Sequence, residues 1–190
     1  MKTKKEHLTT FFILGIMGTT LLGLMGYLPG LEFVGRLHPG YIPMAPSTAL
    51  SFLLLGSALF LLQGKQAPRP GYLILSCLLT MLPAVFGLLE CFGFFLGRDL
   101  SFEDSLFPEL GNLQGVPLGR MSPATGALFF LSGLAMIFQL ASLRMSPLKD
   151  TYLIKLSGIL SSLVLLTAFT ILLGYLYGKP LLYDQPIIPM

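Results

Sequence analysis

The sequence has no tryptophan, two histidines, two cysteines and few charged residues of either sign. Charged residues make up 11% of the 190 positions, whereas an average soluble domain has roughly 25%. A chain with so few charges cannot cover a compact fold with a well-solvated surface, which argues against an ordinary soluble domain. The net charge of +3 is too small to indicate a nucleic-acid partner, and we expect none.

The cysteines and histidines do not predict a metal centre or a disulfide. Cys91 follows Cys77 by fourteen positions in one apolar run, which corresponds to about 21 Å along a helix and exceeds disulfide reach. Neither cysteine has a histidine or another cysteine at the spacing of metal ligands. The Phe and Tyr residues are expected to face lipid or anchor the membrane interface, so no cofactor is predicted.

The motifs of the common catalytic sites are also missing. The chain contains no His-Glu-x-x-His zinc motif, no P-loop and no Ser-His-Asp set. Its two histidines, His7 and His38, lie outside any phospho-acceptor motif, and no glycine-rich ATP-binding box follows them. We therefore predict that this chain is not an enzyme.

Long apolar runs are abundant, since hydrophobic residues make up 54% of the chain. A bilayer is crossed by about 20 helical residues, and five runs approach or exceed that length. We predict an all-α, polytopic transmembrane bundle forming one module over residues 1–190, in which Pro83 bends the third helix. The five predicted spans cover about residues 8–28, 46–63, 72–96, 123–143 and 153–178.

The distribution of basic residues predicts the orientation. The first run is longer than that of a signal peptide and no small-residue cleavage site follows it, so we interpret it as an uncleaved anchor. The N-terminus and the loops near 64–71 and 144–155 carry eight Lys and Arg residues, whereas the loops near 29–45 and 97–121 and the tail carry four. The positive-inside rule then places the N-terminus in the cytoplasm and the C-terminal tail on the outer side.

A short pattern occurs twice and predicts an internal repeat. Residues 44–48 read Met-Ala-Pro-Ser-Thr and residues 121–125 read Met-Ser-Pro-Ala-Thr, each at the start of an apolar run. Proline suits the first turn of a helix, Ser122 is a good N-cap and Ala45 a poor one. A second pattern, Gly-aromatic-x-x-Gly, ends three runs and suits left-handed C-caps, so capping alone accounts for much of the repetition. We predict two complete helix-loop-helix repeats and a truncated third, with the motif residues Met44, Pro46, Thr48, Met121, Pro123, Thr125, Gly26, Gly30, Gly93, Gly97, Gly174 and Gly178.

Two stretches carry a family resemblance. "FGLLECFGFFLGRDLSFEDSLF" at 86–107 and "GRMSPATGALFFLSGLA" at 119–135 resemble the N-terminal membrane-embedded input region of bacterial sensor histidine kinases. Similar regions precede PAS domains and sometimes diguanylate cyclase domains. The resemblance implies a place in the bacterial inner membrane, and a sixth helix followed by cytoplasmic PAS or kinase output domains after the truncated third repeat.

The chain departs from that family's pattern at several positions. The family's outer loop usually contains Gly-Ile-Asp, where this chain has Ser101, Phe102 and Glu103. The asparagine that usually precedes the motif threonine is Ala124, and Gly126 stands where alanine is common. These changes are compatible with the membrane architecture but leave a shared ligand chemistry of the outer loop open.

Glu90 is the ionisable residue that lies well inside an apolar run. Carboxylates within membrane segments are costly and are functional candidates for that reason. Arg98 and Arg120 are its expected partners, because both lie near the same end of the neighbouring runs. A structural ion pair and a sensing role both remain open.

We expect a transmembrane sensory input module of a two-component signalling protein, which passes a conformational signal to output domains outside this chain. Its expected partners are the lipid bilayer, a second copy of the chain in a homodimer, and the cytoplasmic PAS or kinase domains. A small transporter and a non-signalling membrane scaffold are the alternatives. Transporter repeats usually place polar groups near the membrane midplane, whereas the polar features here gather near one end of the runs.

Overall fold

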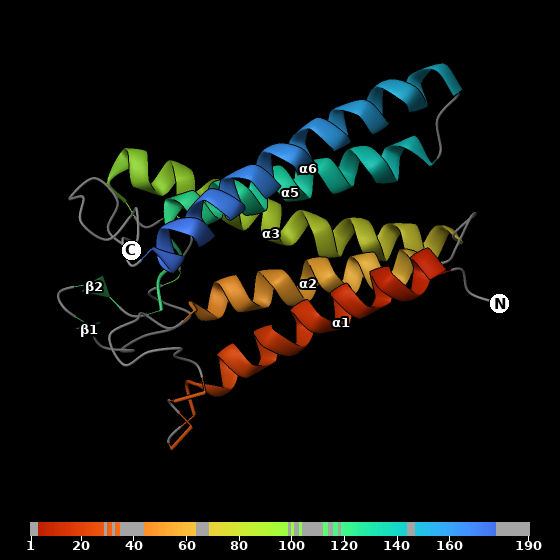
Figure 1. Ribbon diagram of the computed structural model, residues 1–190. Helices are drawn as coiled ribbons and strands as arrows, with labels where there is room; N and C mark the ends of the chain where they lie inside the picture. Colours follow the sequence, from red (N-terminus) through yellow and green to blue (C-terminus); the bar gives the residue numbers. More distant parts are fainter. Residues whose placement is uncertain are drawn as a thin grey trace. The chain divides into compact units, whose positions relative to one another are not determined.

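The computed structural model describes residues 4–28, 30–31, 33–34, 44–63, 69–98, 100, 103, 112–113, 116–117, 119–143 and 147–177. Over these residues the chain forms five long helices, and the predicted all-α fold class is confirmed (Figure 1). Two short strands, β1 (Asn112–Leu113) and β2 (Val116–Pro117), pair antiparallel. The helices are α1 (Lys4–Met25), α2 (Pro46–Leu62), α3 (Pro70–Leu96), α5 (Pro123–Ser142) and α6 (Pro147–Leu176).

Four of the helices contain apolar stretches long enough to cross a membrane, which makes the chain a multi-pass membrane protein. These stretches are Glu6–Met25, Pro70–Leu96, Pro123–Ser142 and Thr151–Gly174. The remaining helix, α2, is apolar but has 17 residues, so it spans about 25 Å at the helical rise. That is slightly less than the hydrocarbon core of a bilayer, about 30 Å.

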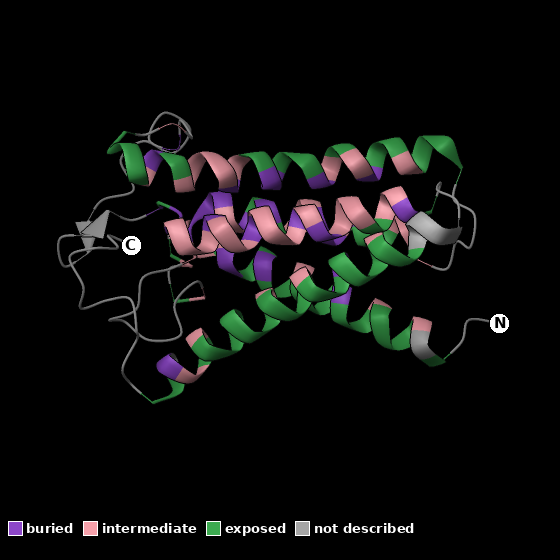
Figure 2. Ribbon diagram, turned by 90° about the horizontal axis from the view of Figure 1, so that it is seen from above, coloured by how far each residue is buried: buried purple, intermediate pink, exposed green. Residues whose placement is uncertain are grey.

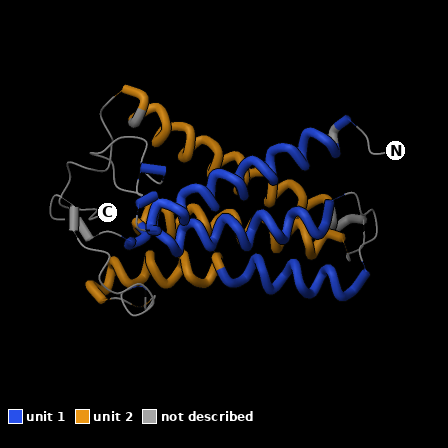
Figure 3. The backbone as a smooth tube through the Cα atoms, turned by 90° about the horizontal axis from the view of Figure 1, so that it is seen from below, with its two compact units in different colours: residues 1–82, 102–121 blue, residues 83–101, 122–190 orange. Residues whose placement is uncertain are grey.

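The chain divides into two compact units, which Figure 3 shows in different colours. Unit 1 comprises residues 1–82 and 102–121, and unit 2 comprises residues 83–101 and 122–190. One boundary falls inside α3, at Pro83, a second falls between residues 101 and 102, and the third falls just before α5. Proline lacks an N–H and leaves the carbonyl four residues earlier without its helical partner, so Pro83 is a natural place for the two units to separate. The single module over 1–190 stays a prediction.

In unit 1, small side chains let the helices approach each other. At Gly56 of α2 an added Cβ would lie 3.0 Å from Cγ of Met17 of α1. The Ser76 hydroxyl of α3 donates to the Ala58 carbonyl of α2 at 3.4 Å. The buried face of α2 consists of Pro46, Ser47, Ala49, Ser51, Leu55, Gly56 and Ala58 (Figure 2).

The far end of α2 is fixed to α1 by one amide side chain. Gln63 Nε2 donates to the Glu6 carbonyl at 2.6 Å and to Thr10 Oγ1 at 2.5 Å. Gln63 Oε1 is buried and has no hydrogen-bond partner. These contacts hold the C-terminal end of α2, whereas the Met-x-Pro-x-Thr motif lies at its N-terminal end.

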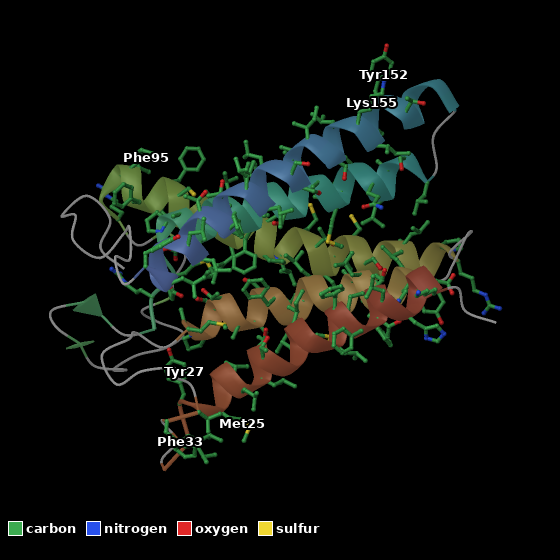
Figure 4. All side chains as sticks on the ribbon, in the orientation of Figure 1. Met25, Tyr27, Phe33, Phe95, Tyr152 and Lys155 are labelled. Atoms are coloured by element: carbon green, nitrogen blue, oxygen red, sulfur yellow. The ribbon has the colours of Figure 1, made fainter. Side chains whose placement is uncertain are left out.

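In unit 2, α5 packs against α6 and against the second half of α3. Gly87 of α3 meets Gly126 of α5 so closely that a Cβ at Gly87 would lie 2.3 Å from the Gly126 carbonyl oxygen. Glycine is therefore required at this crossing of α3 and α5. α6 is exposed along most of its length, and Tyr152 and Lys155 project from its first half (Figure 4).

The two described Gly-aromatic-x-x-Gly elements end their helices differently. At the end of α3, Gly97 has φ +61°, Arg98 N–H bonds to the Gly93 carbonyl at 3.0 Å, and Gly97 N–H bonds to the Phe94 carbonyl at 3.3 Å. These bonds form a Schellman motif, so the predicted left-handed cap is confirmed at Gly97.

α1 ends at Met25, three residues earlier than predicted, because the chain continues from Gly26 in tight turns. Pro29 disfavours a helical conformation at the preceding residue, and Gly30 carries the left-handed conformation with φ +84°. In the third element, Gly174 lies inside α6, and Gly178 lies outside the described residues.

Candidate functional site

The start of α2 lacks the side-chain cap that helices usually have. Ala45 is the N-cap residue, its side chain makes no capping hydrogen bond, and Pro46 occupies the first turn. Ser47 follows and is buried. Its hydroxyl donates a hydrogen bond to Oε1 of Glu103, which comes from the long segment between α3 and α5. This helix start is therefore held by a residue 56 positions away in the sequence.

Glu103 is 2% exposed and is among the most deeply buried side chains described. Its second oxygen, Oε2, accepts the backbone N–H of Met121 at 2.9 Å. Burying a carboxylate is costly unless its oxygens are hydrogen-bonded, and each oxygen here has a donor. One carboxylate thus joins both copies of the Met-x-Pro-x-Thr motif, at Ser47 in the first copy and at Met121 in the second.

A glycine sets the backbone that leads to Met121. Gly119 is buried and has φ +92°, a conformation that side chains with a Cβ rarely adopt. Arg120 then lies exposed at the surface, while Met121 is 3% exposed. This arrangement turns the N–H of Met121 toward Glu103 and leaves the Arg120 side chain outside.

The first motif copy is also tied to the end of α1. The Tyr27 hydroxyl donates to the Met44 carbonyl at 2.9 Å, and Tyr27 lies just beyond the last turn of α1 (Figure 4). A Cβ at Gly23 of α1 would lie 3.5 Å from Cε of Met44, which is ordinary contact. The end of α1, the start of α2, Glu103 and Met121 therefore form one connected set in unit 1, which we call the Glu103 junction.

The second motif copy supplies the N-cap of its own helix. Ser122 is the N-cap of α5, and its Oγ accepts the Thr125 N–H at 3.1 Å and lies 2.8 Å from Thr125 Oγ1. The prediction that Ser122 caps its helix and Ala45 does not is confirmed. The Cys91 thiol of α3 donates to the Pro123 carbonyl at 3.3 Å, so this start is also held against α3.

Glu90 has a different environment from the one predicted for an ion pair. It is half-buried in α3, and its Cβ lies 2.9 Å from the place where Gly126 would carry a Cβ. Within the described part of unit 2, no salt bridge joins Glu90 to Arg98, and Arg98 is exposed. Arg120 belongs to unit 1, so its pairing with Glu90 stays a prediction. Glu90 therefore takes part in the close packing of α3 on α5.

The sequence reasoning missed Glu103. Glu103 was noted only as one of the outer-loop positions at which the chain departs from the resembled family, because charge alone does not distinguish a buried carboxylate from an exposed one. A usable signal was present in Ser47, a polar residue in the first turn of an otherwise apolar helix. The other motif copy has Ala124 there, so Ser47 needed a partner of its own.

The remaining site predictions have plain outcomes. Thr48 and Thr125 both lie half-buried in the first turn of their helices. Cys77 and Cys91 are free thiols. Among the residues the structure describes, no group of three His, Cys, Asp or Glu side chains is close enough to hold a metal ion.

Comparison of the chain with protein families, with curated proteins and with solved structures found no match.

Proposed function

We propose that this chain is the transmembrane sensory input module of a bacterial signal-transduction protein of the two-component histidine kinase type. The observation that carries the proposal is the Glu103 junction, in which a buried carboxylate from the loop segment joins both copies of the motif. A change in this segment acts directly on the start of α2 and on the backbone just before α5. The resemblance of residues 86–107 and 119–135 to sensor input regions supports the same function.

The proposed mechanism is a shift between two helix packings. A stimulus that interacts differently with the two states of the Glu103 junction changes their populations. The change passes through the helices to cytoplasmic PAS or kinase domains, by way of the continuation that the resemblance implies after α6. The exposed apolar side chains of α6, including Leu165 and Phe169, face lipid or a second copy in the proposed homodimer.

The proposed location is the bacterial inner membrane, with the N-terminus and the loops near 64–71 and 144–155 in the cytoplasm. Reporter fusions test this topology. Fusions after Gly64 and Met145 are expected to report a cytoplasmic position, and fusions after His38 and Gly111 an external one. The reverse result at either inner loop contradicts the five-span arrangement.

The function itself is tested with a chimaera. The chain, extended by one added transmembrane helix, is joined to the cytoplasmic kinase domain of a characterised sensor, and autophosphorylation is measured in membrane vesicles. We expect Glu103→Ala to change the kinase rate, and Gly158→Ala, a substitution into open space on α6, to leave it unchanged. Equal rates for Glu103→Ala and the unsubstituted chimaera contradict the proposal, and solute uptake that depends on Glu103 favours a transporter.

A further inference from the structure

The hydrogen bonds of Glu103 favour its ionised form. Oε1 accepts from the Ser47 hydroxyl, and Oε2 accepts the Met121 N–H at 2.9 Å. An ionised carboxylate only accepts, whereas a protonated one carries an O–H donor on one oxygen. With one donor directed at each oxygen, the ionised form satisfies both contacts as they stand. A proton added to either oxygen meets a donor already in place.

The two donors respond differently to that proton. The backbone N–H of Met121 cannot reverse, so a proton on Oε2 would break that contact. The Ser47 hydroxyl can rotate and accept, so the proton is expected on Oε1, with the direction of the hydrogen bond reversed. The Ser47 hydroxyl then needs another acceptor for its own hydrogen.

An acceptor lies just before α2, at the carbonyl of Met44, which precedes the N-cap residue Ala45. Serine hydroxyls commonly donate to a carbonyl three or four residues earlier in the chain, and Met44 is three residues before Ser47. The Met44 carbonyl already accepts the Tyr27 hydroxyl at 2.9 Å, and a carbonyl oxygen has two lone pairs. Protonation of Glu103 therefore turns the charge-assisted hydrogen bond between Glu103 and Ser47 into a weaker neutral one, and it directs the Ser47 hydroxyl hydrogen toward the contact between α1 and α2.

We propose that Glu103 is a proton-binding switch, whose protonation weakens the hydrogen bond by which Glu103 holds the start of α2. This proposal rests on the proposed input function and deepens it, because it names protons as the stimulus. Burial opposes the charged carboxylate, and the two donors stabilise it, so the two forms are in competition at this site.

On the described elements of unit 1 that meet at the Glu103 junction, charged groups are few. α2 contains none, and the part of α3 in unit 1, Pro70–Leu82, contains none. The ionisable residues of α1 (Lys4, Lys5, Glu6 and His7) lie in its first turn, at the end held by Gln63. Tyr27 contributes a neutral hydroxyl from the end of α1. Arg120 is the cationic residue that adjoins Met121 in the chain, and its side chain is exposed.

The test follows the proton directly in the full chain reconstituted in lipid nanodiscs. Infrared spectra are recorded between about pH 8 and about pH 4, a range that includes the ordinary titration of glutamate. We expect the carbonyl band of a buried protonated carboxyl group to grow as the pH falls. Glu103→Gln should remove this band, and Glu90→Gln, the matched change at a half-buried carboxylate, should keep it. A band that is lost in Glu90→Gln and kept in Glu103→Gln overturns the proposal.

Hydrogen exchange at the start of α2 and over residues 119–121 is the second measurement, with the pH dependence of intrinsic exchange removed. We expect protection of the Ala49 amide, which bonds to the Ala45 carbonyl in the first turn of α2, to fall about tenfold on acidification, as expected when a hydrogen bond to a charged group becomes a neutral one. The amide of Glu103→Gln has one donor and one acceptor, like a protonated carboxyl group. This variant should therefore show, at every pH, the low amide protection that the unsubstituted chain shows in acid. Protection that is independent of pH in the unsubstituted chain overturns the proposal.

If Glu103→Gln does not fold, Glu103→Asp replaces it, and a shift of the band's titration midpoint is then the expected result. Neither readout depends on a kinase domain. If Glu103 does not titrate but the kinase rate of the chimaera still responds to Glu103→Ala, the proton switch is refuted and the proposed function is not. If Glu103 titrates but the kinase rate does not respond to Glu103→Ala, the proposed function is refuted and the titration is not.

Discussion

The two copies of the Met-x-Pro-x-Thr motif contain the same residues in a different order. The first reads Ala45-Pro46-Ser47 and the second Ser122-Pro123-Ala124, so serine and alanine have exchanged places around the proline. Where serine comes before the proline, it caps its own helix through the Thr125 N–H. Where it comes after the proline, it binds Glu103 of a distant segment. Moving one hydroxyl by two positions thus changes a local cap into a long-range connection.

The exchange makes the two helix starts dependent on different parts of the chain. The start of α5 depends on its own cap and on contacts with α3 through Cys91 and Gly126. The start of α2 depends on the Glu103 junction, because Ala45 supplies no cap. Under the proposed input function, a stimulus that acts on the loop segment would reach α2 through the Glu103 side chain, so the proposal concerns the first copy of the motif.

The largest expected effect is that of Glu103→Ala. This change leaves the Ser47 hydroxyl and the Met121 N–H as buried donors without an acceptor, and each stranded donor costs about 1–3 kcal/mol. We expect the thermal stability of the chain in detergent to fall by a corresponding amount, with unit 1 affected more than unit 2. Hydrogen exchange resolved by segment measures the difference between the units.

Glu103→Gln is the control for that change, because its amide keeps one acceptor for Met121. It is expected to lose clearly less stability than Glu103→Ala. Equal losses for the two variants would mean that packing, and not hydrogen bonding, holds this side chain.

The second prediction makes the second copy resemble the first at another aligned position. Ala49 occupies the place in the first copy that Gly126 occupies in the second, and Ala49 is fully buried. In Gly126→Ala the new methyl group would lie 2.8 Å from the Gly87 carbonyl oxygen and 2.9 Å from Cβ of Glu90. Overpacking of this kind costs about 1–3 kcal/mol, so we expect a lower melting temperature.

Gly158→Ala is the matched control for Gly126→Ala, since a Cβ at Gly158 meets no atom within 4 Å. Alanine is favoured over glycine in a helix interior by up to about 1 kcal/mol, so Gly158→Ala should be neutral or stabilising. A Gly126→Ala variant as stable as Gly158→Ala would show that α3 and α5 separate easily at this crossing.

The sequence predicted the helices well where local chemistry sets their limits. Proline in the first turn fixes the starts of α2 at Pro46 and α5 at Pro123, and both were predicted at the correct residue. α1 starts at Lys4, four residues before the predicted apolar run, because charged residues can occupy the first turn of a helix while hydropathy excludes them. The cap at Ser122 and the left-handed Gly97 were predicted for the same reason, since each depends on its immediate neighbours.

The Glu103 junction and the crossing of α3 and α5 could not be predicted in this way. Glu103 is 56 residues from Ser47 and 18 from Met121, and no local pattern states which acidic residue of a loop turns inward. Gly87 and Gly126 are two of 21 glycines, and only the packing of the helices shows that these two meet. Contacts between distant residues depend on the tertiary structure, which periodicity and capping rules do not contain.

The third prediction removes the local cap from the second copy. Ser122→Ala takes away the acceptor of the Thr125 N–H, and the loss of an N-cap serine costs about 1 kcal/mol. We expect a small fall in melting temperature and faster exchange in the first turn of α5, with the exchange of α2 unchanged. Faster exchange in α2 as well would indicate that the two helix starts are coupled, in contrast to the separation described above.

The smallest expected effect is a gain from giving the first copy the cap that the second has. In Ala45→Ser the new hydroxyl can accept the Thr48 N–H, as Ser122 accepts that of Thr125. Ala45 is 7% exposed, so the hydroxyl must fit a tight space, and we expect a stabilisation of about 0.5 kcal/mol, at the low end for a cap.

The informative measurement is made on the background of Glu103→Ala. If α2 starts poorly in that variant because Ser47 has lost its hydrogen bond to Glu103, Ala45→Ser should recover more stability there than in the unsubstituted chain. An equal gain in both backgrounds would mean that Glu103 and the cap act independently, and that Glu103 serves the loop segment more than the start of α2.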